Sequence, residues 1–338
     1  MKSFIEKLID RKNLSSKEME GAMSAIMNGS LSNADMATFL LHLRAKGPTV
    51  DEITGAALVL RRHSIKVKTK HQRILDTCGT GGDRKGTFNI STIAAFVVAG
   101  AGVIVAKHGN RSVSSRCGSA DILEALGVHM DLSAENLGKC LDDIGMTFLF
   151  AQKLHPAMKF AAPVRKELGV ETIFNLLGPL TNPAGATHQV VGVYSKDLVD
   201  PLIRVLKNLG LQKAIVVHGS DGLDEITTTG ATFIGEYDGQ EIKFYPLTPL
   251  EYDIPLARAE DLNGGDLNVN VQIAGDIFKG HRGPKRDIVL LNAALALYVA
   301  GEAATIKNGI TLAARSIDSG AALKKLEQLK EFSNKHRT

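Results

Sequence analysis

The sequence predicts an α/β protein, in which a small all-helical domain accompanies a larger domain built on a mostly parallel central sheet covered by helices. Two observations carry this prediction. Residues 1–64 contain four short helix patterns and no strand pattern. From Lys70 onward, short β-branched runs alternate with helical patterns, which is typical of parallel strands joined by helical crossovers.

The N-terminal helix patterns begin at capping residues. The first has an apolar face within residues 4–9, and Ser32 opens the third. Ser15 and Thr49 each stand three residues before a glutamate, which is the spacing of a capping box. These helices are too apolar to stand alone, so we expect them to bury a face against the rest of the chain or a partner subunit.

The larger domain begins with alternating strand and helix patterns. The expected strands cover 102–106, 147–150, 189–194 and 214–218, and the expected helices cover 120–126, 134–144 and 198–209. Two further runs, 232–237 and 241–245, are joined through Asp238-Gly239 and are typical of a hairpin added at one edge of the sheet. Helices over 287–300, 306–317 and 321–332 are expected to close the chain.

Composition limits the classes of partner. The net charge of +4 and the absence of Trp argue against a nucleic-acid surface, while a modest positive charge suits an anionic small molecule. Three cysteines, Cys78, Cys117 and Cys140, lack metal-type spacing and indicate a reducing compartment. Residues 1–13 carry charges throughout, unlike a signal peptide, and no apolar run approaches the ~20 residues of a membrane span. We therefore expect a cytoplasmic protein without nucleic-acid or membrane partners.

The stretch from Asp76 to Thr92 is typical of an anion-binding turn between a strand and a helix. A short apolar run enters it, Gly79, Gly81 and Gly82 form the turn, and a longer apolar run leaves it. Glycine adopts positive φ freely and lets a ligand approach the main chain. Backbone N–H groups at a helix N-terminus then attract an anion. This order predicts a phosphate or pyrophosphate site.

The turn matches neither common phosphate fingerprint. Arg84 stands where the dinucleotide pattern has its third glycine, and Gly86-Thr87-Phe88 stands where the P-loop has Gly-Lys-Ser/Thr. Ser91 and Thr92, at the expected helix start, add hydroxyl donors. A glycine-rich connection without a ligand remains the alternative.

A second candidate loop, Lys107 to Ser115, follows an expected strand. It combines Lys107, Arg111, Gly109 and several hydroxyls, a set that suits a polyphosphate clamp, and a helix start at 118–121 lies behind it. A solvated polar loop is the alternative. Because the carboxyl ends of parallel strands meet at one sheet edge, we expect this loop to lie near the glycine turn.

An acidic pair, Asp224-Glu225, follows a third strand. Mg²⁺ favours one or two carboxylates completed by substrate phosphates and water, so the pair suits a metal site beside a pyrophosphate. An ordinary acidic turn is the alternative. Asp83 would repel a phosphate, and we expect it to organise the loop by accepting backbone N–H bonds rather than to meet a metal-bound water.

A fourth stretch, His155 to Lys159, precedes Arg165 on the same helical run. Arg165 has the chemistry to bind a carboxylate through two charge-assisted hydrogen bonds. An arginine on a helix is more often a surface residue, however, and a histidine before proline is more often a cap.

Together these stretches resemble the anthranilate phosphoribosyltransferase family over nearly the whole chain. The motifs that carry the resemblance, in the family's order, are the Gly-Thr-Gly-Gly-Asp turn, Asn89-Ile90-Ser91-Thr92, Lys107 to Ser115, Gly118 to Asp121, His155 to Lys159, Asn175 to Pro183 and Asp224-Glu225.

The resemblance implies a fold of the nucleoside phosphorylase and phosphoribosyltransferase type and a homodimer. It places residues 1–68 and about 163–185 in the small helical, dimerising domain, and residues 69–162 and 186–338 in the α/β domain. It also implies transfer of phosphoribosyl from phosphoribosyl pyrophosphate to the amine of anthranilate, releasing pyrophosphate with Mg²⁺.

The family's site residues carry over by position. Ser91, Asp224 and Glu225 would hold Mg²⁺, and Gly79, Asn110, His155 and Arg165 would face anthranilate. The phosphoribosyl donor would be held by Gly79, Gly82, Asp83, Thr87, Asn89, Ile90, Ser91, Thr92, Lys107, His108, Gly109, Asn110, Arg111, Ser112, Val113, Ser114, Ser115 and Ser119.

The chemistry implied by the resemblance needs no strong general base, because departure of pyrophosphate itself creates an oxocarbenium-like centre. His108 is one candidate proton acceptor, although a phosphate or ribose contact is favoured. Arg84 stands where the family often has a small residue. Two other functions are alternatives: a pyrimidine-nucleoside phosphorylase of the same fold, against which the acidic pair argues, and a non-catalytic nucleic-acid binder, against which the weak basic surplus argues.

Overall fold

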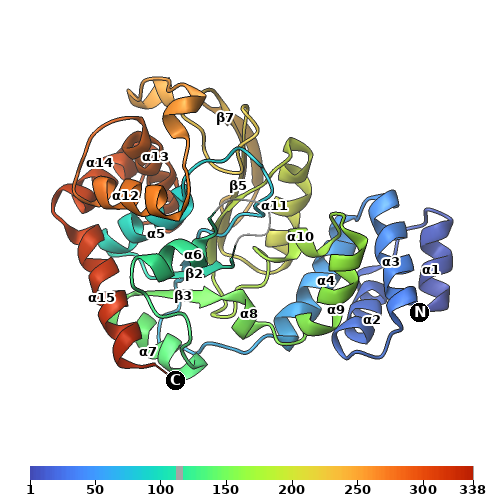
Figure 1. Cartoon of the computed structure of the whole chain (residues 1–338). Helices are drawn as coiled ribbons and strands as arrows, with labels where there is room; N and C mark the ends of the chain where they lie inside the picture. Colours follow the sequence, from blue (N-terminus) through green and yellow to red (C-terminus); the bar gives the residue numbers. More distant parts are fainter. Residues whose placement is uncertain (112–116, 338) are drawn as a thin grey trace.

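The computed structural model describes residues 1–111 and 117–337. Four helices at the N-terminus confirm the helical prediction: α1 (Lys2–Ile9), α2 (Ser16–Met27), α3 (Asn33–Lys46) and α4 (Val50–His63). Ser15 and Thr49 form capping boxes with the glutamates three residues on, and Ser32 caps α3. Later in the chain, α9 (Met158–Leu168) packs against α2 and α3, and α10 (Phe174–Leu177) packs against α4 (Figure 1).

One seven-stranded sheet organises the larger part of the molecule, in the order β3-β2-β1-β4-β5-β6-β7. The first five strands of this order are parallel, and β6 and β7 add an antiparallel hairpin at the edge, as predicted. The strands are β1 (Leu75–Asp76), β2 (Val105–Gly109), β3 (Met146–Phe150), β4 (His188–Gly192), β5 (Lys213–Gly219), β6 (Thr232–Tyr237) and β7 (Ile242–Leu247).

The strand order contains a topological switch at β1. Leu75 pairs with Val105 of β2 on one side and with His188 of β4 on the other. The chain therefore leaves β1 toward β2 and β3 and returns to the opposite side of β1 as β4. In open α/β sheets, ligands bind at such a point, beyond the carboxyl ends of the strands. The glycine turn follows β1 and so lies at the switch.

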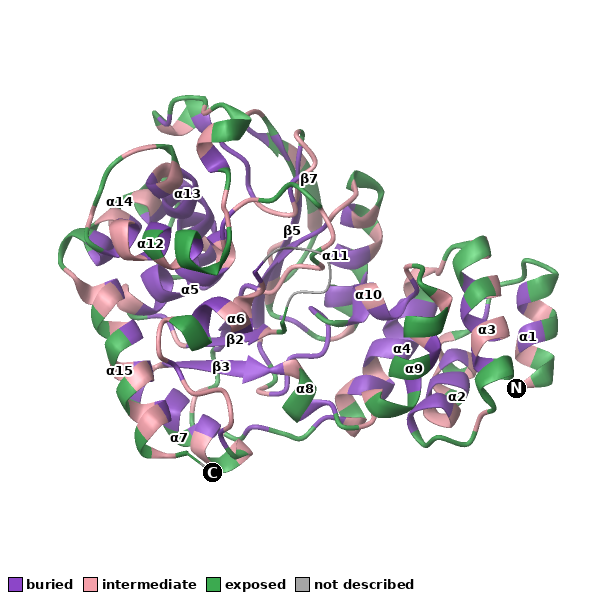
Figure 2. Ribbon diagram, viewed as in Figure 1, coloured by how far each residue is buried: buried purple, intermediate pink, exposed green. Residues whose placement is uncertain are grey.

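Helices cover both faces of the sheet. In β5, Ile215 and Val217 belong to a core formed with α5 (Ile90–Gly100) and α13 (Pro284–Val299), whereas Ala214 and Val216 belong to a core shared with α11 (Val199–Asn208) and the N-terminal helices. Successive strand residues point to opposite faces. The apolar surface of the N-terminal helices is thus buried partly against α11, and Figure 2 shows α5 and α13 buried almost throughout.

The remaining helices complete the cover around the sheet. They are α6 (Ser119–Ala125), α7 (Ala134–Ile144), α8 (Ala151–Leu154), α12 (Leu267–Phe278), α14 (Ile306–Asp318) and α15 (Ala321–Lys335), with 3₁₀ turns at Lys196–Leu198, Pro249–Tyr252 and Ala259–Leu262. Within the described ranges, no helix combines the length and apolar character needed to cross a membrane.

Two local expectations differ from the structure. Residues 107–109 belong to β2 and not to the loop that follows, because their backbone pairs with β3 through Gly109 and Phe150. Helix α12 was not expected, although its N-cap Asp266, which accepts a hydrogen bond from the N–H of Val269, is an ordinary start signal. The expected domain boundary at 163 falls inside α9, and the division into two domains stays a prediction.

Candidate active site

Three loops meet at the carboxyl edge of the sheet. The N–H of Thr80 donates to Gly192 O at 2.8 Å, and the N–H of Gly81 donates to Asp224 Oδ2 at 2.8 Å. A Cβ at Gly79 would lie 3.1 Å from that carboxylate oxygen, and one at Gly192 would lie 1.5 Å from Asp224 O. Glycine at these positions therefore lets the three backbones pack together. The predicted convergence of the glycine turn and the acidic pair is confirmed.

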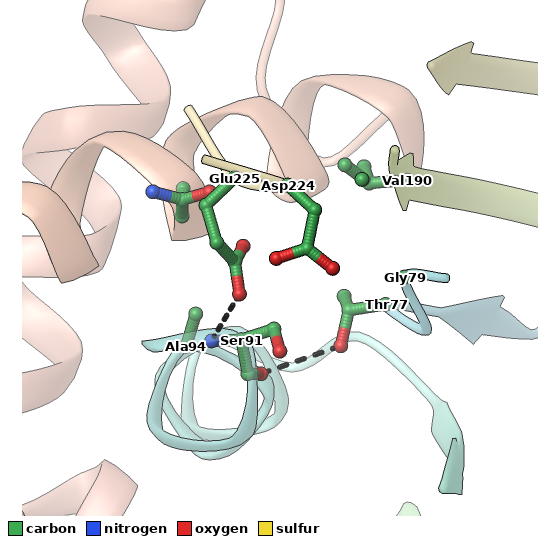
Figure 3. A pocket seen from close by; sticks show the side chains of 9 residues that line it. Thr77, Gly79, Ser91, Ala94, Val190, Asp224 and Glu225 are labelled. Carbon is green, nitrogen blue, oxygen red and sulfur yellow. Dashed lines mark hydrogen bonds between the residues drawn. The ribbon is translucent and has the colours of Figure 1, made fainter. Parts of the chain in front are cut away.

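A pocket lies between these loops and the N-terminus of α5. Figure 3 shows the carboxylates of Asp224 and Glu225 pointing toward Ser91 and Thr77. The pocket is lined by Thr77, Gly79, Ser91, Ala94, Val190, Gly192, Asp224, Glu225 and Asn292.

The surroundings of the two acids disfavour their negatively charged forms. Burial raises the pKa of Asp224 well above its usual range, and the negative charges of Glu225 and Asp83 raise it further. Burial also raises the pKa of Glu225 to about 7, although Lys107 and hydrogen bonds from Ser91 act in the opposite direction. A divalent cation would relieve this repulsion, and two carboxylates with a serine hydroxyl form an oxygen donor set that fits Mg²⁺.

The start of α5 differs slightly from expectation. Asn89 is the N-cap and makes no side-chain cap, while Ser91 lies in the first turn and donates its N–H to Glu225 Oε1 at 3.1 Å. Ile90 and Thr92 are buried, and the N–H of Ile90 donates to Phe88 O at 2.8 Å, so the predicted donor contacts of these two residues stay predictions. Asn89 Nδ2 donates to Cys117 O at 3.1 Å, and its buried Oδ1 has no hydrogen-bond partner among the described residues.

Lys107 lies deeper than a loop residue would. Its side chain is 2% exposed, and its Nζ donates to Thr77 O at 2.9 Å. Its positive charge lowers the pKa of both Glu225 and Asp76. In this structure Lys107 supports the main chain of the glycine turn and offsets the charge of Glu225 and Asp76, and its expected role in a polyphosphate clamp stays a prediction.

His108 and His155 face each other inside the protein. Their Nε2 atoms are 3.2 Å apart, and His108 Nδ1 is 3.0 Å from Gly178 O. Burial lowers the pKa of His108 to about 3 and that of His155 to about 4. Both rings are neutral at physiological pH. Such a low pKa makes His108 a poor proton acceptor, which argues against the base role considered above.

Sequence reasoning missed the buried network beneath this pair. Asp76 accepts hydrogen bonds from the N–H of His108 at 3.0 Å and from Asn182 Nδ2 at 2.8 Å, and burial raises its pKa to about 6. Asp76, Cys78 and His108 lie close enough together to surround a metal ion. Because its carboxylate already accepts these hydrogen bonds, we interpret Asp76 as the support of the His108 backbone.

The loop after β2 is described only in part, and predicted donor residues Ser112, Val113, Ser114 and Ser115 lie outside the described ranges. Arg111 pairs with Asp121 at 3.0 Å and Glu124 at 2.7 Å on α6, so its guanidinium is held by acids there. Ser119 Oγ donates to Asn110 O at 3.1 Å. A Cβ at Gly109 would lie 2.4 Å from Ser119 Oγ, which explains the glycine.

Asp83 has the organising role expected of it. Its Oδ1 accepts the N–H of Lys85 at 3.2 Å, and its carboxyl group also contacts that of Asp224. Arg84 adopts φ +57°, a left-handed conformation at the position where the dinucleotide fingerprint has a glycine. Lys85, which sequence reasoning did not single out, lies over Gly222, where a Cβ would be 2.8 Å from Lys85 Cε.

The residues expected to face anthranilate do not all line the same pocket. Gly79 lines the acidic pocket, whereas His155 lines a second pocket with Met27, Leu60, His63, Ala157 and Met158. Arg165 lines neither pocket. Its half-buried guanidinium lies 5.2 Å from the ring centroid of Phe174, and burial lowers its pKa.

Comparison with known proteins agrees across the whole chain. The sequence model of the glycosyl transferase family, helical bundle domain, matches residues 2–64, and that of the glycosyl transferase family, a/b domain, matches residues 71–323. The chain is 54% identical over 329 residues to the anthranilate phosphoribosyltransferase of Moorella thermoacetica, covering 97% of each chain. It is 49% identical over 337 residues to that of Symbiobacterium thermophilum, covering 100% of this chain and 99% of the relative.

Solved structures agree as well. The anthranilate phosphoribosyltransferase of Thermus thermophilus superposes with a TM-score of 0.93 at 42% identity, covering 98% of this chain and 99% of that one. The Saccharomyces cerevisiae enzyme in complex with PRPP and Mg superposes with a TM-score of 0.91 at 29% identity, covering 98% and 97%.

Proposed function

Because the chain belongs to the anthranilate phosphoribosyltransferase family, we propose that it moves the phosphoribosyl group of phosphoribosyl pyrophosphate to the amine of anthranilate in tryptophan biosynthesis. Pyrophosphate leaves in the same reaction. One observation carries the proposal for this site: Asp224 and Glu225 lie against the N-terminus of α5 in a pocket at the switch point of the sheet.

We assign the metal to Ser91, Asp224 and Glu225. Mg²⁺, when bound, would neutralise negative charge on the departing pyrophosphate. The chain's own part is to position the donor: the N-terminus of α5 would offer the positive end of its dipole, and the glycine turn would let the donor approach the main chain closely. The positive charge of Lys107 partly offsets the negative charge of the acids and so weakens their repulsion of the donor.

The reaction breaks the bond between C1 of the ribose and a pyrophosphate oxygen, and forms a bond from C1 to the amine nitrogen. Positive charge develops at C1 as the leaving group departs. The site needs to hold the weakly nucleophilic aryl amine in line with C1, and the amine proton passes to solvent water once the new bond has formed. The neutral His108–His155 pair fits a positioning role here rather than that of a strong base.

Anthranilate would approach from the side of the helical domain. We propose that Gly79, Asn110, His155 and Arg165 contact it, with the guanidinium of Arg165 receiving the carboxylate. The half-buried position of Arg165 supports this, because a charge-assisted hydrogen bond strengthens away from bulk water.

We also propose a cytoplasmic homodimer that associates through the helical domain. Apolar side chains are exposed there at Ile9 (54%), Leu41 (41%) and Phe160 (36%). Light scattering coupled to gel filtration tests the dimer: a mass of one chain would exclude it.

The activity has a direct assay. Protein, phosphoribosyl pyrophosphate, Mg²⁺ and anthranilate are mixed, and the loss of anthranilate fluorescence is followed with pyrophosphate release. A parallel reaction with a pyrimidine nucleoside and inorganic phosphate distinguishes the phosphorylase alternative. Turnover only in that second mixture would overturn the proposal.

A further inference from the structure

A segment that follows the acids by more than 30 residues packs on residues 86–88, between the glycine turn and α5. We call residues 259–266 the strap; it includes the 3₁₀ turn Ala259–Leu262 and leads into α12. Asn263 forms an antiparallel bridge with Thr87, and the N–H of Gly264 donates to Gly86 O at 2.9 Å. A Cβ at Gly264 would lie 2.8 Å from Phe88 N. The strap therefore packs directly on the part of the turn that enters α5.

Lys285 holds the strap through hydrogen bonds to its main chain. It lies in the first turn of α13, where its Nζ donates to Asp261 O at 2.6 Å and to Asn263 O at 2.7 Å. The same ammonium is 5.5 Å from the ring centroid of Phe88. One side chain thus contacts both the strap and the turn beneath it, and its partners are main-chain carbonyls at two points of the strap.

The strap is also connected to Cys117 and, through it, to Asn89. Asn270, 2% exposed on α12, accepts the N–H of Gly265 at 3.0 Å and interacts with the Cys117 thiol. The carbonyl of Cys117 in turn accepts Asn89 Nδ2. The strap is therefore linked to residues 86–89 by two routes, one through the main chain of Gly86 and Thr87 and one through Asn270 and Cys117.

We propose that Lys285 is a positioning residue for the phosphoribosyl donor: by fastening the strap it holds residues 86–89 in the shape that receives the diphosphate. This inference rests on the proposed function. Lys285 lines neither pocket and none of its hydrogen bonds or ring contacts in the described part of the chain involves the acids or Arg165. Its loss should therefore weaken binding of the donor much more than binding of anthranilate or of the metal.

The test compares Lys285→Met with Lys285→Arg and with Lys307→Met, a matched control on α14 whose exposed ammonium pairs with Asp253. For Lys285→Met, we expect KM for phosphoribosyl pyrophosphate to rise about tenfold, the size of one lost charge-assisted hydrogen bond. KM for anthranilate should stay within about twofold. Lys285→Arg should restore most of the donor affinity, because a guanidinium can donate to both carbonyls.

Gly264→Ala gives a second route, since the added methyl would push the strap off Phe88 and should produce the same split between the two KM values. If both KM values change equally, or the donor KM is unchanged while wild type is active, Lys285 serves only the fold and the inference is overturned. If wild type itself does not consume anthranilate with this donor, the proposed function falls, and the inference falls with it.

Discussion

Asp224 and Glu225 are adjacent in the chain, yet their surroundings differ. Asp224 accepts an N–H from the glycine turn and touches the carboxyl group of Asp83, whereas Glu225 accepts an N–H from the first turn of α5 and feels the charge of Lys107. Each carboxylate thus accepts a hydrogen bond from one wall of the pocket, and the two negative charges together favour the binding of a cation.

Glu225→Gln should raise the Mg²⁺ concentration needed for half-maximal rate by at least about tenfold, because a neutral amide is a much weaker ligand for a hard cation. The measurement is an Mg²⁺ titration of the initial rate at saturating donor. Glu251→Gln, an exposed acid on the 3₁₀ turn after β7, is the matched control. An unchanged titration would mean that the acidic pair is only a turn.

Arg165→Ala should weaken use of anthranilate far more than use of the donor. Loss of a charge-assisted contact is worth roughly 1.5–3 kcal/mol, hence about ten- to a hundredfold or somewhat more in apparent affinity. Steady-state KM values for both substrates test this, with Lys166→Ala, the exposed neighbour on α9, as control. Equal weakening for both substrates would remove Arg165 from the acceptor site.

At the scale of elements, the contacts between the N-terminal helices depend on one buried carboxylate. Glu52, in the capping box of α4, accepts the N–H of Leu14 at 2.8 Å and of Thr49 at 2.7 Å, and pairs with Lys46 at 2.8 Å. Its side chain is fully buried. The capping box thus also attaches the segment before α2 and the end of α3 to the start of α4, which the spacing alone did not reveal.

Glu52→Ala should lower the free energy of unfolding by about 3–5 kcal/mol, because it leaves the Lys46 ammonium without a carboxylate to balance its charge and the N–H groups of Leu14 and Thr49 without their acceptor. Urea unfolding followed by circular dichroism measures it. Glu20→Ala is the control: Glu20 pairs with the exposed Arg62, so its loss should cost less than about 1 kcal/mol. Similar losses for the two variants would contradict a special role for Glu52.

At the scale of the whole molecule, the buried titratable groups set how stability depends on pH. Burial lowers the pKa of His108 to about 3 and of His155 to about 4, from 6.5. As pH falls below 6.5, these histidines become protonated in the unfolded chain but stay neutral in the folded protein. They therefore lower the free energy of unfolding toward pH 4. Asp76 acts oppositely: with its pKa raised from 3.8 to about 6, it stabilises the fold as pH falls through that range.

Asp224 and Glu225, whose pKa values burial also raises, act in the same direction as Asp76, so the contribution of one histidine is measured by removing it. His155→Asn should remove a loss of stability that grows as pH falls from 6.5 to 4, so the free energy of unfolding of the variant should rise relative to wild type by up to about 3 kcal/mol over this range. Urea unfolding at a series of pH values is the measurement, and the exposed His281→Asn is the control. A slope in the variant as steep as in wild type would show that His155 does not contribute.

Features that depend on near neighbours in the chain could be predicted from the sequence. The caps at Ser15, Ser32 and Thr49, the edge hairpin and the glycine turn each follow from residues a few positions apart, and each is present in the structure. The motifs also predicted which loops would carry charge and hydroxyls at the carboxyl edge of the sheet.

The contacts between distant segments could not be predicted in this way and are known from the folded chain. The hydrogen bonds from Gly81 to Asp224 and from Ser91 to Glu225 span 143 and 134 residues, and the strand order that makes β1 and β4 neighbours brings them together. The burial of Lys107 and the strap held by Lys285 were equally absent from any local pattern. Such contacts depend on which surfaces the whole chain must bury at once, and no window of sequence contains both partners.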